Sequence, residues 1–104
     1  MPNSPDNLLK QLFDLVVERK GAKLPNSYTA SLFKKGRARI AQKVGEEAVE
    51  TVIAAMKNDK VELVNEVADL FFHTFVLMAD SDVTLDDVIF ELQKRRMKRD
   101  HDRE

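Results

Sequence analysis

Residues 38–80, ARIAQKVGEEAVETVIAAMKNDKVELVNEVADLFFHTFVLMAD, decide the fold of this chain of 104 residues. On both sides of Asn58 and Asp59, apolar side chains recur every three or four residues, which is the spacing of an amphipathic α-helix. The pattern predicts two helices of roughly 20 residues, over 38–57 and from 60 to about 80. Because Asn58 and Asp59 allow only a short turn, the two helices should pack as an antiparallel pair.

Two shorter helices are expected before this pair. Ser4 and Pro5 are typical of an N-cap followed by the first helical residue, and Gly21 is the expected end of that first helix. After a linker, Ser27 can cap a short second helix that ends near Gly36.

One further helix is expected after the pair. Thr84 and Asp87 have the spacing of a capping box, in which each side chain binds the backbone amide of the other residue. The charged residues from Lys94 onward, with the tail proper at about 97–104, are expected to be the frayed end of this last helix.

The sequence therefore predicts an all-α helical bundle that forms one domain over residues 1–104, because no alternating run is long enough for a strand. The two long helices would be rods of about 30 Å with wide apolar arcs. The shorter helices are too small to cover both arcs, so we expect a homodimer whose core is shared between the chains.

Composition excludes several classes of protein. Apolar residues make up 43% of the chain and charged residues 34%, which excludes a disordered or collagen-like chain. There is no cysteine, so disulfides and thiolate metal sites are excluded. The apolar run at 70–72 ends at His73, and the first ten residues lack the apolar core of a signal peptide. We therefore expect a cytoplasmic protein without membrane contact.

The net charge of −1 conceals a segregation of charge along the chain. Residues 1–45 carry a net charge of +6, residues 46–92 carry −10, and residues 93–104 carry +3. Such blocks are either solvated faces or sites for ions of opposite charge, so the positions of the charges decide between the two.

Two pairs of carboxylates, Glu47 with Glu50 and Glu66 with Asp69, lie on acidic stripes of the two long helices. Both pairs are at similar distances from the turn, so they can share one site. Like charges at this spacing destabilise a helix by about 0.2–0.5 kcal/mol per pair, and lysines are absent from most flanking positions. A bound cation would remove this cost. The alternative is a solvated acidic surface, which is common on helices.

Four carboxylates without cysteine suit a hard, oxygen-preferring ion, so Mg²⁺ is the expected metal, with Mn²⁺ as the alternative to it. His73 lies one turn beyond Asp69 on the same stripe, where it is either a packed histidine or a functional one. A di-iron site is excluded because neither long helix contains Glu-x-x-His.

A run of basic residues precedes the acids. It can clamp phosphate groups around Gly36, with hydroxyl donors nearby, or it can simply form a solvated loop and first helical turn. No aromatic side chains alternate with the basic ones, so we expect no nucleic-acid partner. The basic residues are Lys34, Lys35, Arg37, Arg39 and Lys43, and the hydroxyl donors are Ser27, Thr29 and Ser31.

Three segments, SYTASL at 27–32, KVGEEAVE at 43–50 and EVADLFFH at 66–73, resemble the phosphoribosyl-ATP pyrophosphatase family. This family lies within the all-α, MazG-like nucleoside triphosphate pyrophosphohydrolase superfamily. The paired carboxylates alone match only the superfamily, whereas the first two segments match the specific family. The resemblance covers about residues 7–96.

The resemblance implies Mg²⁺-dependent hydrolysis of 1-(5-phosphoribosyl)-ATP to 1-(5-phosphoribosyl)-AMP and pyrophosphate, the second step of histidine biosynthesis. It implies metal ligands at Glu47, Glu50, Glu66 and Asp69, and catalytic roles for Glu46, as a supporting or water-orienting carboxylate, and for Glu47. The residues expected to contact the nucleotide substrate are Ser27, Tyr28, Thr29, Lys34, Lys35, Arg37, Lys43 and His73.

The chain departs from the family pattern at two places that leave the acids untouched. Phe72 stands where a tyrosine is usual, and Ser81 and Asp82 replace a common glycine turn. Many family members are fused to the cyclohydrolase that acts next, and we expect this chain to be too short to contain it.

Two other functions remain open at the level of sequence. A house-cleaning (d)NTP pyrophosphohydrolase would use the same acids, so only the 27–32 segment separates it from the first reading. A non-enzymatic helical adaptor would use the acidic stripe to bind a basic partner, and it would gain no stability from Mg²⁺.

Overall fold

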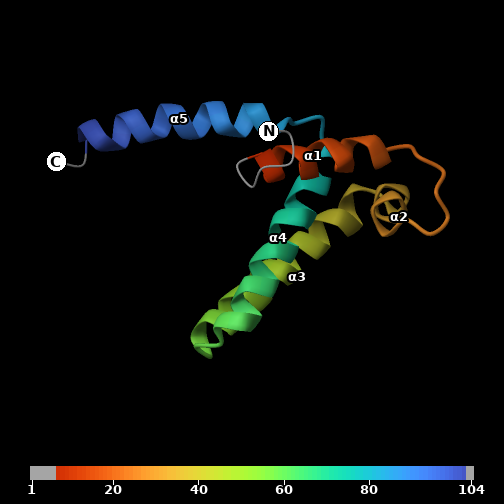
Figure 1. Cartoon of the computed structure of the whole chain (residues 1–104), viewed down its shortest axis with the longest axis horizontal. Coiled ribbons are helices and arrows are strands. Elements are labelled where there is room, and N and C mark those ends of the chain that lie inside the picture. The colour runs from red at the N-terminus through yellow and green to blue at the C-terminus, as the bar shows by residue number, and fades with distance from the viewer. Residues whose placement is uncertain (1–6, 103–104) are drawn as a thin grey trace.

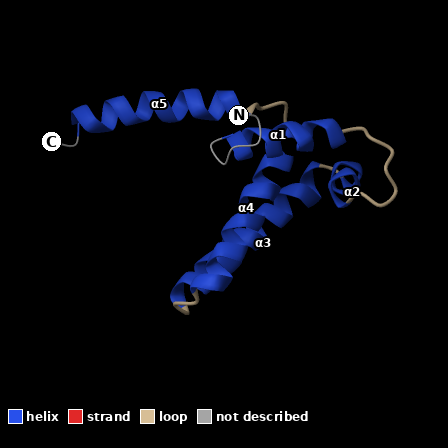
Figure 2. Cartoon of the chain, in the orientation of Figure 1, coloured by secondary structure: helices blue, strands red, loops and turns tan. Residues whose placement is uncertain are grey.

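The computed structural model describes residues 7–102, and the side chains of residues 7–96. Figures 1 and 2 show that this part of the chain is helical and contains no strand, so the prediction of an all-α fold is confirmed. α3 and α4 form a long antiparallel hairpin, and α1 and α2 pack near one end of it. The five helices are α1 (Leu8–Arg19), α2 (Tyr28–Lys35), α3 (Arg37–Met56), α4 (Lys60–Asp80) and α5 (Leu85–Asp102).

The turn between α3 and α4 forms as predicted. Asn58 has a φ of 58°, and its N–H binds the carbonyl of Ala55, while the N–H of Asp59 binds the carbonyl of Ala54. This is a Schellman motif, in which a left-handed residue satisfies the last carbonyls of a helix. The Asp59 side chain then accepts from the N–H of Glu62 and caps α4.

The turn between α4 and α5 repeats this design. Asp82 has a φ of 59°, and the N–H of Asp82 binds the carbonyl of Ala79 while the N–H of Val83 binds that of Met78. The predicted capping box is present, since the Thr84 hydroxyl accepts from the N–H of Asp87 and the Asp87 carboxylate accepts from the N–H of Thr84.

The predicted fraying from residue 94 is wrong for residues 94–102, which are helical. Ion pairs of Glu91 with Lys94 and Arg95 explain the continued helix.

At the start of the chain, the helix boundary predicted from Ser4 and Pro5 lies outside the described residues. α1 begins at Leu8 and ends at Arg19, and Gly21, with a φ of 78°, follows as the predicted stop. The predicted cap of α2 is also present, because the Ser27 hydroxyl accepts from the N–H of Ala30 at 3.1 Å.

Gly36 is both the C-cap of α2 and the N-cap of α3, so no loop separates these helices. Its φ of 99° and ψ of 169° fall in a region that is open essentially to glycine alone. The direction of α2 relative to α3 is therefore set at one residue.

The core lies where α1, α2, the start of α3 and the end of α4 meet. The rings of Phe13 on α1 and Phe75 on α4 pack edge to face with their centroids 5.5 Å apart. Leu32, Ile40 and Val76 are fully buried around them. Lys20 ties the end of α1 to the end of α4 through a 2.9 Å hydrogen bond to the carbonyl of Ala79.

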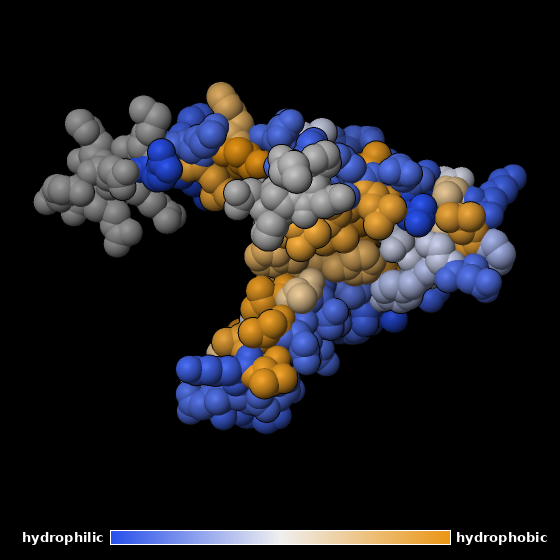
Figure 3. All heavy atoms as spheres, viewed as in Figure 1, coloured by the Kyte–Doolittle hydropathy of each residue, from blue (hydrophilic) through white to orange (hydrophobic). Residues whose placement is uncertain are grey.

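The α3–α4 hairpin packs within the chain through the side of α3 that carries the acidic stripe. Ala54, which shares that side with Glu47, is completely buried. The opposite side is apolar and exposed, and we call it the outer apolar face. Figure 3 shows this apolar surface on the hairpin, toward α5. It comprises Val49, Val52, Ile53, Met56, Val61 and Val64.

Within residues 7–102, none of the helices has the length and apolar character needed to cross a bilayer.

Candidate metal centre

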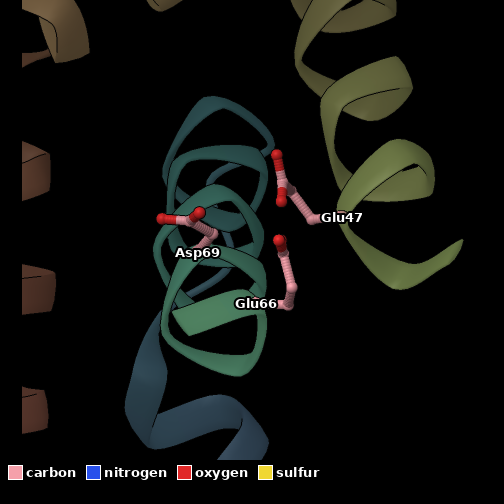
Figure 4. Close-up of side chains that lie close together, drawn as sticks. All are labelled: Glu47, Glu66 and Asp69. Carbon is pink, nitrogen blue, oxygen red and sulfur yellow. The ribbon is translucent and has the colours of Figure 1, made fainter. Parts of the chain in front are cut away.

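Three carboxylates of the predicted set meet between α3 and α4. Glu47, Glu66 and Asp69 each place one oxygen within 4.8 Å of the others. Figure 4 shows Glu47 of α3 and Glu66 of α4 pointing toward one another, with Asp69 further along α4. The turn at Asn58 brings the helices into this register. The structure thus joins residues that are about 20 apart in the sequence.

Two oxygens of this cluster lack partners although they are buried. Glu47 is only 7% exposed, and neither its Oε1 nor the Oε1 of Glu66 has a hydrogen-bond partner among the described residues. The other oxygen of Glu47, Oε2, lies 3.6 Å from Nζ of Lys43. A buried carboxylate oxygen without a donor is costly, typically by 1 kcal/mol or more. A cation held between these oxygens would remove this cost.

The pKa of Glu66 also reflects the closeness of the other carboxyl groups. Interaction with the Glu47 carboxyl group, then desolvation, then the charge of Glu50 raise the pKa of Glu66 to about 7. Glu50 itself is exposed and lies beside the cluster rather than within its closest group. A donor set made only of carboxylate oxygens, two of them unpartnered, fits Mg²⁺ or Mn²⁺.

Glu46 is not among the three clustered carboxylates and instead pairs with basic side chains. Its carboxylate lies 3.4 Å from Nζ of Lys43 and 3.8 Å from Nη1 of Arg39, and it accepts a hydrogen bond from Gln42. Burial lowers the pKa of Lys43, but the hydrogen bond to Glu46 and the nearby Tyr28, Glu46 and Glu47 outweigh that effect, so the pKa lies above its usual value. Lys43 is therefore a firmly charged cation next to the acids.

Tyr28 and His73 form a hydrogen-bonded pair beside the cluster. His73 is 5% exposed, and its Nδ1 lies 2.8 Å from the carbonyl oxygen of Asp69. Because a carbonyl can only accept, Nδ1 carries the proton, and in the neutral ring Nε2 accepts from the Tyr28 hydroxyl at 3.0 Å. The Tyr28 ring also stacks on Phe72, with centroids 6.1 Å apart.

The structure does not bring the other predicted basic residues to the acids. Arg37 donates to the side chain of Asp80 at 2.8 Å and to its carbonyl at 2.9 Å. Asp80 lies eleven residues beyond Asp69 on α4, which is about 16 Å along the helix. Lys34 lines a cavity of about 850 Å³ at that same end, and Lys35 is exposed. Of the basic residues predicted to bind phosphate, Lys43 is the one that adjoins the cluster.

A second cavity, of about 510 Å³, lies between α1 and the linker that leads to α2. Ser27 and Thr29 of the predicted set line it, and so does Phe72. Arg19 also lines it, although the sequence did not single this residue out. A lone basic residue in the last turn of a helix normally signals only an interaction with the helix dipole, so no sequence signal marked it.

Comparisons with known proteins identify the family of this chain. A family model described as phosphoribosyl-ATP pyrophosphohydrolase matches residues 9–96. The chain is 52% identical over 92 residues to the "Histidine biosynthesis bifunctional protein HisIE" of Buchnera aphidicola, covering 88% of this chain and 43% of that protein. It is 46% identical over 93 residues to the "Phosphoribosyl-ATP pyrophosphatase" of Bacillus cereus, covering 89% of this chain and 87% of that protein. The chain thus spans less than half of the bifunctional relative.

Proposed function

Because this chain belongs to the phosphoribosyl-ATP pyrophosphohydrolase family, we propose that it hydrolyses 1-(5-phosphoribosyl)-ATP in histidine biosynthesis. Water attacks the α-phosphorus, the bond from that phosphorus to the bridging oxygen breaks, and 1-(5-phosphoribosyl)-AMP and pyrophosphate are released. The observation that carries the proposal is the pair of buried, unpartnered oxygens of Glu47 and Glu66. We further propose that the reaction takes place in the cytoplasm.

The residues that would hold Mg²⁺ are Glu47, Glu66 and Asp69, with Glu50 beside them. When bound, Mg²⁺ supplies positive charge that offsets the carboxylates and the triphosphate and stabilises the leaving pyrophosphate. Without such charge, the cluster would repel a polyphosphate.

The chain's own residues would then orient the substrate. Lys43 is held in place by Glu46 and Glu47 and would bind the outer phosphate oxygens. Tyr28, fixed by His73, lies beside Lys43 and would contact the same part of the substrate. The proton of the attacking water passes to Glu46 or Glu47, which are the two carboxylates nearest Lys43.

Substitution of single acids tests this function. Glu47→Gln and Glu50→Gln should each lower the rate of pyrophosphate release by about two orders of magnitude or more, while circular dichroism shows unchanged helix content. Glu62→Gln is the matched control, since Glu62 lies on the same stripe but pairs with Lys57 outside the cluster. A rate like that of the wild type in Glu47→Gln at saturating Mg²⁺ would overturn the proposed site.

Binding of the metal can be tested apart from turnover. Titration calorimetry should detect uptake of Mg²⁺ or Mn²⁺, and a melting curve should shift upward in millimolar Mg²⁺. The absence of both effects would favour the adaptor function. Parallel assays with dNTPs would show whether the chain is instead a house-cleaning enzyme, which would hydrolyse them at least as well.

We also propose that the chain acts as a homodimer. The outer apolar face has side chains that are 49–77% exposed, on the half of the hairpin that lies farthest from the core. A second copy could cover this face with the same surface of its own. Sedimentation equilibrium should then give twice the 11.9 kDa of one chain.

A further inference from the structure

We infer that the cavity between α1, the linker and Phe72 binds the adenine and phosphoribosyl part of the substrate, and that Arg19 recognises the 5′-phosphate of the phosphoribosyl arm. The inference rests on the proposed function, because it assigns a subsite of the same reaction. It makes Arg19 a specificity-determining residue, since ATP and dNTPs lack this second sugar phosphate.

The cavity has the size and lining of a nucleoside site. Its volume of about 510 Å³ lies in the range of ~300–1,000 Å³ that is usual for small-molecule pockets. The apolar side chains of Leu12, Leu24 and Pro25 suit a planar base, and Asn26 and Thr29 offer polar groups to a sugar. Figure 1 shows the linker leaving the end of α1 and turning back to α2, and Leu24, Pro25 and Asn26 of this linker line the cavity.

Phe72 connects the cavity to the Tyr28–His73 pair beside the carboxylate cluster. Phe72 lines the cavity, and its ring contacts both the stacked ring of Tyr28 and, at 5.0 Å between centroids, that of His73. Phe72 follows Asp69 by three residues, which is about 4.5 Å along α4. The larger cavity, by contrast, is lined by Asp80, about 16 Å beyond Asp69. The smaller cavity is thus the one that lies nearer the carboxylate cluster along α4.

Arg19 provides the only charged side chain among the residues that line this cavity. Its guanidinium forms no ion pair within the described part of the chain, and no carboxylate lines the cavity to compete for it. A guanidinium presents a fork of donors that matches two phosphate oxygens at once. An unpaired arginine at the edge of an apolar cavity therefore fits a sugar phosphate attached to a base.

The test uses the reaction product, because 1-(5-phosphoribosyl)-AMP lacks the pyrophosphate that would engage the metal centre. In calorimetry on the full chain, Arg19→Gln should weaken binding of this product about tenfold or more, and leave binding of AMP unchanged. Arg19→Lys keeps the charge but loses the forked pair of donors, so its affinity for the product should lie between those of the wild type and Arg19→Gln. Lys10→Gln is the control, since Lys10 lies on the same helix outside the cavity.

Kinetics provide a second readout. Arg19→Gln should raise KM for 1-(5-phosphoribosyl)-ATP with little change in kcat, and should not alter any residual hydrolysis of dATP. Equal losses for the product and for AMP, or no loss for either, would refute the role of Arg19. If the wild-type chain does not hydrolyse 1-(5-phosphoribosyl)-ATP at all, the proposed function fails instead, so the two failures are distinguishable.

Discussion

At the scale of single residues, Glu66 couples the stability of the fold to pH. Its pKa is raised from 4.5 to about 7, mainly by interaction with Glu47. Between these two values the folded chain holds a proton at this position that the unfolded chain has released. The stabilising contribution is therefore complete below about pH 4.5 and is lost as the pH rises to about 7.

Thermal melts in EDTA across this pH window test the effect. The melting temperature of the wild-type chain should fall from pH 4.5 to 7 relative to that of Glu66→Gln, whose amide does not titrate. Adding Mg²⁺ should flatten the difference, because a bound cation favours the ionised carboxylate. Parallel curves for the two proteins in EDTA would contradict the prediction.

Tyr28 can be tested by removing a single oxygen. Tyr28→Phe keeps the ring stacked on Phe72 but leaves Nε2 of the buried His73 without its donor. We expect a loss of about 1–2 kcal/mol in the free energy of unfolding, as for a buried acceptor left unpaired. Urea unfolding measures this loss. Phe72→Leu is the comparison, since it alters the stack and spares the hydrogen bond.

At the scale of helices, the turn at Asn58 should respond to backbone strain in a predictable direction. Asn58→Ala places a residue without a favourable local hydrogen bond at a φ of 58° and should cost about 1 kcal/mol. Asn58→Gly should be neutral or stabilising by about a few tenths of a kcal/mol, because glycine is preferred at this position of a Schellman motif. The strain that glycine relieves slightly exceeds the entropy that it loses on folding. Chemical denaturation measures the free energy of unfolding, which should be at least as large with Gly at position 58 as with Asn, and smaller with Ala.

Local signals in the sequence predicted the helices and their caps well. Ser27, Asp59 and Thr84 bind the backbone amides that their spacing indicated, because capping depends on residues only three apart. The meeting of Glu47 with Glu66 was predictable too, since a two-residue turn fixes the register of a hairpin. These features need no knowledge of distant contacts.

Features that depend on packing between distant segments were not predictable. The sequence predicted wide apolar arcs on both long helices, but it did not predict that α3 packs against α4 through the side of Glu47 and Ala54. The basic run could have formed a single phosphate-binding group, but Arg37 instead donates to the carbonyl of Asp80 at the C-terminal end of α4. Arg19 became a candidate only when the linker and Phe72 enclosed a cavity around it.

At the scale of the whole molecule, the outer apolar face should control association. Val52 is 61% exposed on this face, and Val52→Glu would bring two like charges together across a two-fold axis. We expect the dissociation constant of the dimer to rise by about a hundredfold or more. Sedimentation velocity measures this change. Lys23→Glu in the linker serves as the control, and equal association of both variants would place the interface elsewhere.

Gly36 has a consequence for the precision of the site. α2 extends eight residues from Gly36 back to Tyr28, so its far end is about 12 Å away. A rotation of about 10° at this single joint would move Tyr28 by about 2 Å, several times the tolerance of ~0.5 Å typical of catalytic groups. Gly36 is thus the single joint that sets the position of Tyr28, which we propose contacts the substrate, and variants at Gly36 should lower the proposed activity while leaving both helices intact.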